Sequence, residues 1–275
     1  MPDPSEKSAS NEYGIDVFER SDVTVLQHQQ MQAHISSTQS EAVFFLDEMA
    51  FGEGSNLTNY LFVIVTLSVL TLLQRHGFFA IHGAALATQD GSAVIIVGPS
   101  DSGKSTLSLN IAKAGWDYLS DDSILLYDNG DSVEVRPFRR HFGVDPDAAE
   151  LFPEIEQVAS QMLTDPDKWR LDVESIFSGK LVESASPEVI VFPHVANSEK
   201  TTTDRISQVD AITQLMTQGT FIEADREIAS RQMSLFAKLV KQCANYRLNS
   251  GLDIKANPAL VDELMLGLLA RNHPA

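Results

Sequence analysis

The stretch G-P-S-D-S-G-K-S at residues 98–105 decides the fold of this chain. It matches G-x-x-x-x-G-K-[ST] at every fixed position, follows an apolar run at 93–97 that is typical of a buried strand, and precedes an expected helix at about 105–114. Glycines at both ends let such a loop wrap a phosphate group so that successive backbone N–H groups point inward. The alternative is an ordinary glycine-rich turn, but the strand and helix around it favour nucleotide binding.

Two side chains of this loop carry chemistry of their own. Lys104 would reach the terminal phosphates as a point charge, and the Ser105 hydroxyl would bind a magnesium ion. The residues expected to line the bound nucleotide are Gly98, Pro99, Ser100, Asp101, Ser102, Gly103, Lys104, Ser105 and Thr106.

Two adjacent carboxylates, Asp121 and Asp122, follow the expected helix just ahead of a strand expected at 123–127. One helix and a return to the sheet bring the chain back to the edge where phosphates lie. One carboxylate can hold magnesium and the other can accept a proton from an attacking hydroxyl. Both are candidate catalytic residues, and Asp122 is the candidate metal ligand beside Ser105. The pattern alone does not decide which aspartate binds magnesium and which accepts the proton. The alternative is a solvated acidic turn.

A histidine precedes the loop in the sequence. His82 lies in the expected strand 78–87, which the turn signal Gln89-Asp90-Gly91 joins to 93–97 as an antiparallel hairpin. This pairing would place His82 near the mouth of the loop, where it is a candidate catalytic residue. A histidine on an apolar strand is otherwise a satisfied core residue.

Basic side chains are few and cluster after the second expected hairpin, at 123–127 and 133–135. Arg136, Arg139, Arg140 and His141 form the main cluster, and Arg140 and Arg139 are the candidate substrate-binding residues because arginine binds phosphate and carboxylate groups in a bidentate way. An ion-paired surface is the alternative. Lys168 and Arg170 form a weaker second set.

Elsewhere the pattern predicts one domain at 21–275 behind a disordered tail at 1–20, with the nucleotide-binding core at about 76–142. The apolar run 61–73 is too short to span a bilayer and indicates a buried core helix at 58–76. The other expected elements are strands at 23–26, 42–46 and 189–192 (ended by Pro193), short helices and loops at 144–187, and a helical last third with helices after Ser207, at 224–243 and from Pro258.

The composition limits the classes of partner and the cellular setting that we expect for this protein. The chain has 275 residues, with 38 acidic against 20 basic side chains and a formal net charge of −18. Such acidity argues against nucleic acid and anionic membrane surfaces as partners. The single cysteine, Cys243, excludes an internal disulfide, and the sequence carries no signal-peptide pattern, so a cytoplasmic setting is expected.

The stretch from His82 to Leu126 resembles the catalytic domain of HPr kinase/phosphorylase and related serine kinases, some encoded beside lasso peptides. It runs I-H-G, a hairpin, V-G-P-S-D-S-G-K-S-T-L, then L-S-D-D. The resemblance implies an α/β fold with a P-loop of the HPr kinase and phosphoenolpyruvate-carboxykinase type and a mixed sheet. It implies transfer of the γ-phosphate of ATP to a serine, with roles for Lys104, Ser105, the paired aspartates and His82. The R-G-x-G signature of true HPr kinases is missing, so HPr is not the expected acceptor.

The sequence therefore predicts an ATP- and magnesium-dependent kinase that phosphorylates a hydroxyl, with serine the expected acceptor residue, on a peptide, protein or small molecule. The alternatives are a nucleotide-binding regulator without transferase activity and a simple nucleotide hydrolase. The identity of the acceptor, the choice between ATP and GTP, and the formation of a homo-oligomer stay open.

Overall fold

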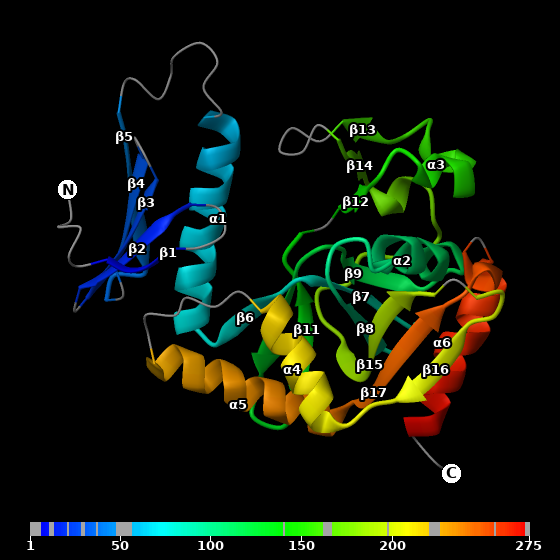
Figure 1. Ribbon diagram of the computed structural model, residues 1–275. Coiled ribbons are helices and arrows are strands. Elements are labelled where there is room, and N and C mark those ends of the chain that lie inside the picture. Colours follow the sequence, from blue (N-terminus) through cyan, green and yellow to red (C-terminus); the bar gives the residue numbers. More distant parts are fainter. Residues whose placement is uncertain are drawn as a thin grey trace. The chain divides into compact units, whose positions relative to one another are not determined.

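The chain divides into two compact units, one made of residues 1–79 and 221–232 and the other of residues 80–220 and 233–275 (Figure 1). This computed structural model describes residues 7–10, 14–20, 22–28, 31–36, 38–47, 57–139, 141–161, 167–196, 198–219, 226–255 and 257–272. The sequence predicts one domain behind a tail at 1–20, whereas Asp16–Arg20 forms a strand. The reason is burial, because Ile15 and Val17 belong to the core of the first unit.

The first unit is an antiparallel sheet covered by one helix. Its strands follow chain order: β1 (Lys7–Ser10), β2 (Asp16–Arg20), β3 (Val23–His28), β4 (Met31–Ser36) and β5 (Glu41–Leu46). Every second residue of β4 is buried, and these side chains pack with Ile64 of α1 (Leu57–Arg75). The expected strands and helix are therefore confirmed. However, Phe62, Val65 and Val69 remain exposed, so α1 is buried on one side only.

The second unit is built on a six-stranded mixed sheet in the order β16-β17-β15-β8-β7-β9. The strands are β7 (Gly83–Ala87), β8 (Ser92–Val97), β9 (Asp117–Ser120), β15 (Ser186–Val195), β16 (Thr202–Arg205) and β17 (Ala244–Ser250). Strand β8 runs parallel to β15 and antiparallel to β7. It is buried from Ala93 to Val97, as its continuous apolar sequence predicts.

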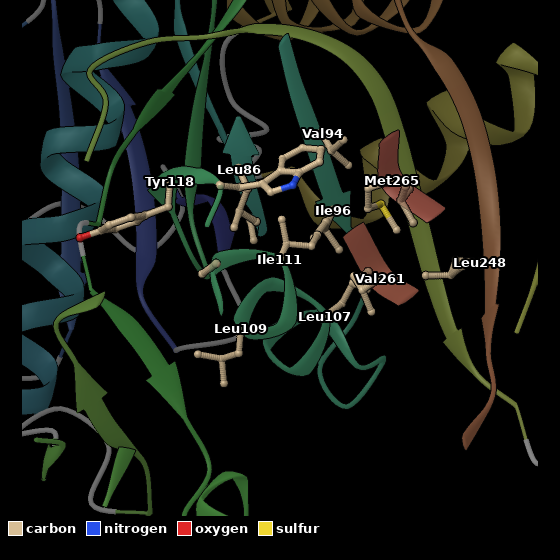
Figure 2. Close-up of a cluster of buried hydrophobic side chains, with 14 of the residues drawn as sticks. Leu86, Val94, Ile96, Leu107, Leu109, Ile111, Tyr118, Leu248, Val261 and Met265 are labelled. Atoms are coloured by element: carbon tan, nitrogen blue, oxygen red, sulfur yellow. The ribbon is translucent and has the colours of Figure 1, made fainter. Parts of the chain in front are cut away.

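Helices α2 (Lys104–Lys113) and α6 (Pro258–Asn272) share one apolar core with this sheet. Figure 2 shows Leu107 and Ile111 of α2 close to Ile96 of β8, with Val261 and Met265 of α6 beside them. The helices α4 (Gln208–Gln218) and α5 (Arg226–Gln242) complete the expected helical elements. Ser207 caps α4 by accepting the Asp210 N–H at 3.1 Å, as its spacing predicts.

The two expected hairpins are present, with one change. Strand β7 pairs with β8, and β10 (Ile124–Asp128) pairs with β11 (Val133–Pro137). The expected strand 78–87, however, breaks at His82, and its first half is β6 (Phe78–Ile81), which joins β10 and β11 in a separate three-stranded sheet. The break leaves His82 between two sheets rather than inside a strand.

Two sets of strands were not expected. The first set, β16 and β17, lies in the last third of the chain. The second set is a small sheet of β12 (Phe142–Val144), β14 (Trp169–Leu171) and β13 (Ser160–Gln161). The same region contains α3 (Ala148–Leu151) and the 3₁₀ turns η3 (Pro153–Ile155) and η4 (Val173–Ser175). In β17 the apolar positions Ala244, Tyr246 and Leu248 are separated by polar residues, a period of two that the helices on either side obscure. Pro193 also does not end β15, which continues to Val195.

The outer strand β9 is covered by the connection after Gly179. Lys180 and Val182 exchange backbone hydrogen bonds with Tyr118, at 2.9 and 3.0 Å. Such cover protects an edge strand from pairing with another chain. None of the helices in the described part of the chain combines the length and the apolar character needed to cross a lipid bilayer.

Gly179 must be small for this connection to close, because a Cβ added there would lie 1.9 Å from the carbonyl oxygen of Trp116. We expect Gly179→Ala to lower the free energy of unfolding by about 1–3 kcal/mol through overpacking. Gly267→Ala is the matched control, since a Cβ in the middle of α6 meets nothing within 4 Å and should stabilise the helix by about 1 kcal/mol. Urea unfolding of both variants measures the difference, and equal stability of the two would contradict the prediction.

Candidate functional site

The loop 98–103 joins the carboxyl end of β8 to the first turn of α2. Gly103 is the N-cap residue, with φ of 92°, and no side chain caps the helix. The first backbone N–H groups of α2 therefore have no capping side chain, as at a helix that binds an anion. Gly98 is packed against the far side of the loop, because a Cβ there would lie 2.7 Å from the Ser102 hydroxyl oxygen.

Lys104 is the first residue of α2, and its side chain folds back over the loop. Its Nζ donates a hydrogen bond to the carbonyl oxygen of Pro99 at 2.8 Å, and the residue is buried. Burial lowers the pKa of Lys104, while the nearby charges of Asp121 and Asp122 oppose this change. The structure thus gathers these three expected site residues within electrostatic reach of one another.

Asp121 is buried beside the start of α2. The Ser105 hydroxyl donates to its Oδ2 at 3.4 Å, whereas its Oδ1 has no hydrogen-bond partner among the described residues. Burial and the neighbouring charge of Asp122 raise the pKa of Asp121 to about 7, against the lowering effect of Lys104 and His82. The carboxyl group therefore gives up its proton less readily than an ordinary aspartic acid. The sequence pairs Ser105 with Asp122, whereas the structure brings Ser105 to Asp121.

Asp122 has the opposite environment. Its side chain is 38% exposed, and its carboxylate contacts Arg139 at 2.8 Å and Nδ1 of His82 at 3.2 Å. Burial alone would raise the pKa of Asp122, but the hydrogen bond and charge of His82, with the charges of Arg139 and Lys168, lower it to about 2. Asp122 therefore stays ionised at neutral pH.

Backbone contacts fix the turn that holds both aspartates. Asp122 has φ of 70°, and its carbonyl oxygen accepts the Gly83 N–H at 3.3 Å and lies 2.8 Å from Nδ1 of His82. This ring nitrogen must carry a hydrogen, because both Asp122 oxygens that it contacts are acceptors. His82 also donates its own backbone N–H to Gln218 at 2.8 Å, which anchors the break between β6 and β7.

Ser120 joins this turn to the arginine segment. Its hydroxyl accepts the Arg139 N–H at 3.2 Å and contacts the carbonyl oxygens of Arg139 and Ser123, the latter at 2.5 Å. The residue is fully buried. This contact brings Arg139 to Asp122, although 17 residues separate them in the sequence.

The basic cluster is only partly assembled at the site. Arg139 reaches Asp122, whereas Arg136 pairs with Glu134 at 3.0 Å and lies over the ring of Tyr127. Arg140, the other candidate substrate-binding residue, lies outside the described residues. Burial and the charges of Arg170 and Arg139 lower the pKa of His141, so both arginines lie within electrostatic reach of this histidine.

Lys168 is a site residue that the sequence favours only weakly. It directly precedes β14, whose pairing with β12 the sequence does not predict. Burial is the main cause of the lowered pKa of Lys104, and the charge of Lys168 adds to it. The same charge contributes to the low pKa of Asp122, so Lys168 lies within electrostatic reach of both groups.

The donor set fits a magnesium ion that also binds phosphate. Within the described residues, no group of three or more His, Cys, Asp or Glu side chains gathers to hold a metal ion. The Ser105 hydroxyl and the Asp121 carboxyl group, with its unpartnered Oδ1, instead offer two oxygen ligands beside the loop. Magnesium in nucleotide sites takes one or two protein oxygens and completes its shell with phosphate and water.

Comparison with known proteins adds little to this geometry. No protein-family model and no curated protein matches the chain. Among solved structures, the HPr(Ser) kinase/phosphatase from Coxiella burnetii aligns with a TM-score of 0.33 and 15% sequence identity, over 70% of this chain and 95% of that one. Similarity at this level is distant and carries no information on the activity of this chain.

The contrasting environments of the two aspartates predict opposite effects on stability in metal-free buffer. Burial and the charge of Asp122 raise the pKa of Asp121 above the ordinary range of a carboxyl group, to about 7, so the buried group costs stability as pH rises from about 4 towards neutral. Asp121→Asn should therefore raise the free energy of unfolding at pH 8, and by less at pH 5. Asp122→Asn should lower it at both values, because His82 and Arg139 lose their partner. Urea unfolding at pH 5 and 8 tests this, and a destabilised Asp121→Asn at pH 8 would refute it.

Proposed function

We propose that this protein is an ATP- and magnesium-dependent kinase of the P-loop type that transfers the γ-phosphate to a hydroxyl group, most simply that of a serine. The observation that carries the proposal is the pair of aspartates beside the loop: one buried next to Lys104 and Ser105, the other partly exposed and held ionised. A phosphate loop alone fits many nucleotide-binding proteins, whereas a fixed, accessible carboxylate next to it fits transfer to an acceptor. The resemblance of 76–142 to HPr-kinase-like proteins supports the same class.

The uncapped start of α2 and the loop amides would hold the β- and γ-phosphates, with Lys104 as the charged ligand. The Lys104 ammonium group donates to the Pro99 carbonyl oxygen at 2.8 Å, so the loop itself satisfies it until phosphate oxygens replace this contact. Ser105 and Asp121 would hold the magnesium ion, which neutralises charge on the phosphates when it is bound. This assigns Asp121, rather than Asp122, to the metal.

Asp122 would orient the acceptor hydroxyl and take its proton. Exposure decides between the two aspartates, since the Asp122 side chain is 38% exposed and Asp121 only 1%. A carboxylate with a low pKa is a weak base, but it suffices because phosphoryl transfer passes through a loose transition state in which little charge builds on the acceptor. His82 and Arg139 hold this carboxylate from two directions, so its orientation is set before the acceptor arrives.

Arg139 and Lys168 add positive charge on the Asp122 side of the loop. Arg139 is bonded to Asp122, and Lys168 lies near enough to lower the pKa values of both Lys104 and Asp122. These cations would stabilise charge on the transferred phosphoryl group. The acceptor would then approach over Asp122, and we place this reaction in the cytoplasm, where a free thiol such as that of Cys243 stays reduced.

Nucleotide binding should depend on Lys104. Lys104→Ala is expected to weaken magnesium–ATP binding at least tenfold, because it removes the one cation inside the loop region. Lys113→Ala is the matched control, since Lys113 lies in the last turn of the same helix and pairs with Glu154 at 2.6 Å. Isothermal titration calorimetry with a non-hydrolysable ATP analogue measures both affinities. Wild-type affinity in Lys104→Ala would exclude the proposed site.

Phosphoryl transfer should depend on Asp122 while binding does not. With γ-labelled ATP and a library of serine-containing peptides, Asp122→Asn should lose at least a hundredfold in transfer rate and keep its ATP affinity. Asp128→Asn is the control, because Asp128 ends β10 and pairs with Lys238. Label released only as free phosphate would indicate a hydrolase. Tight ATP binding with neither transfer nor release would indicate a nucleotide-binding regulator.

A further inference from the structure

The loop follows β8, and the residues at this edge of the sheet differ between the two sides of β8. On one side, His82 directly precedes β7, and Asp121 and Asp122 directly follow β9; the reacting end of the nucleotide belongs there under the proposed function. On the other side lie the carboxyl ends of β15 and β17, which run parallel to β8 and to each other. A triphosphate is a linear chain, so with its γ-phosphate beside the aspartates its nucleoside extends away from them.

Strand β15 carries an apolar row beyond the edge of the core. Val189 and Val191 are buried and pack with α2, and the strand period of two places Pro193 and Val195 on the same face. Val195 is 55% exposed, and its Cγ2 would lie 3.5 Å from a Cβ built on Gly103. An exposed valine therefore stands directly beside the last residue of the loop.

Strand β17 extends this surface. Ser250 pairs with Val195 in the parallel register and continues the face of the buried Tyr246 and Leu248. The 3₁₀ turn η5 (Leu252–Ile254) follows, in which Leu252 is 68% exposed. This turn runs alongside α2, since the Asn110 side-chain amide of α2 donates to the carbonyl oxygen of Lys255 at 3.3 Å.

From this continuity with the loop, we propose that Val195, Ser250 and Leu252 form a nucleobase shelf, on which the base of the bound nucleoside triphosphate rests. The inference depends on the proposed function for the phosphate end and adds the position of the nucleoside. Apolar side chains contact the flat face of a base rather than its hydrogen-bonding edge, and adenine and guanine share that face. The shelf therefore contributes affinity for a purine nucleotide without choosing between ATP and GTP.

The test uses the full-length protein with magnesium and three probes: ATP, GTP and inorganic tripolyphosphate. The double substitution Val195→Ser with Leu252→Ser removes the apolar contact without adding charge, and both side chains are exposed, so the fold should persist. We expect ATP and GTP each to bind about tenfold more weakly and tripolyphosphate to change by less than about twofold. The matched control is Val209→Ser, at a 73% exposed valine in the first turn of α4, which should change none of the three.

Isothermal titration calorimetry gives the affinities, and a urea transition equal to that of the wild type confirms folding. Unchanged ATP and GTP affinities in the double variant would overturn the nucleobase shelf while leaving the proposed function in place. An equal loss for ATP and tripolyphosphate would also overturn it, because the effect would then come from the loop. A wild-type protein that binds none of the three probes would refute the proposed function itself, and the shelf with it.

Discussion

The candidate site depends on one backbone group, the carbonyl oxygen of Asp122. It receives the N–H of Gly83 and faces the protonated Nδ1 of His82, which ties the break between β6 and β7 to the turn between β9 and β10. Asp122 adopts φ of 70° to place this carbonyl, a conformation that costs an aspartate about 1 kcal/mol or more. The reversal of the chain at this point turns Asp121 inward to Ser105 and leaves Asp122 outward beside Arg139. Two neighbouring carboxyl groups thereby acquire pKa values on opposite sides of the ordinary range.

Under the proposed function, this division would let a chain with a net charge of −18 hold a small polyanion. The positive groups are few and local: the uncapped amides of α2, Lys104, Arg139 and Lys168. The acidic groups among them do not cancel this charge equally, because burial raises the pKa of Asp121 and Asp122 is already paired with Arg139. A basic surface of the kind that nucleic acid requires is not needed, since a single phosphate chain is short enough to be bound by one loop.

Local patterns in the sequence predict the loop, both hairpins, the capped helix α4 and the position of Asp121 and Asp122 just ahead of a strand, because each is encoded within a few residues. They fail where a long-range contact decides. The pairing of β12 with β14 joins residues far apart in the chain, so the approach of Lys168 has no local signal. Strand β17 is masked by the helices on either side of it. The pairing of Ser105 with Asp121 rather than Asp122 depends on the left-handed turn, and an aspartate gives little warning of that conformation.

The direction of the strands explains why residues from five segments meet at one edge. Strands β8, β9, β15 and β17 all end there, because β9 is antiparallel to β7, which is antiparallel to β8, and β15 and β17 are parallel to β8. Strands β7 and β16 begin there, and the residue before β7, His82, stands level with the start of the loop. The residues on the two sides of β8 therefore differ in chemistry. On the β7 side this edge of the sheet has titratable groups, and on the β15 side it has the apolar end of a buried strand. Under the proposed function, a nucleotide laid across this edge would have its phosphates beside the titratable groups and its base beside the apolar end of β15, at the carboxyl ends of the strands where open α/β sheets bind ligands.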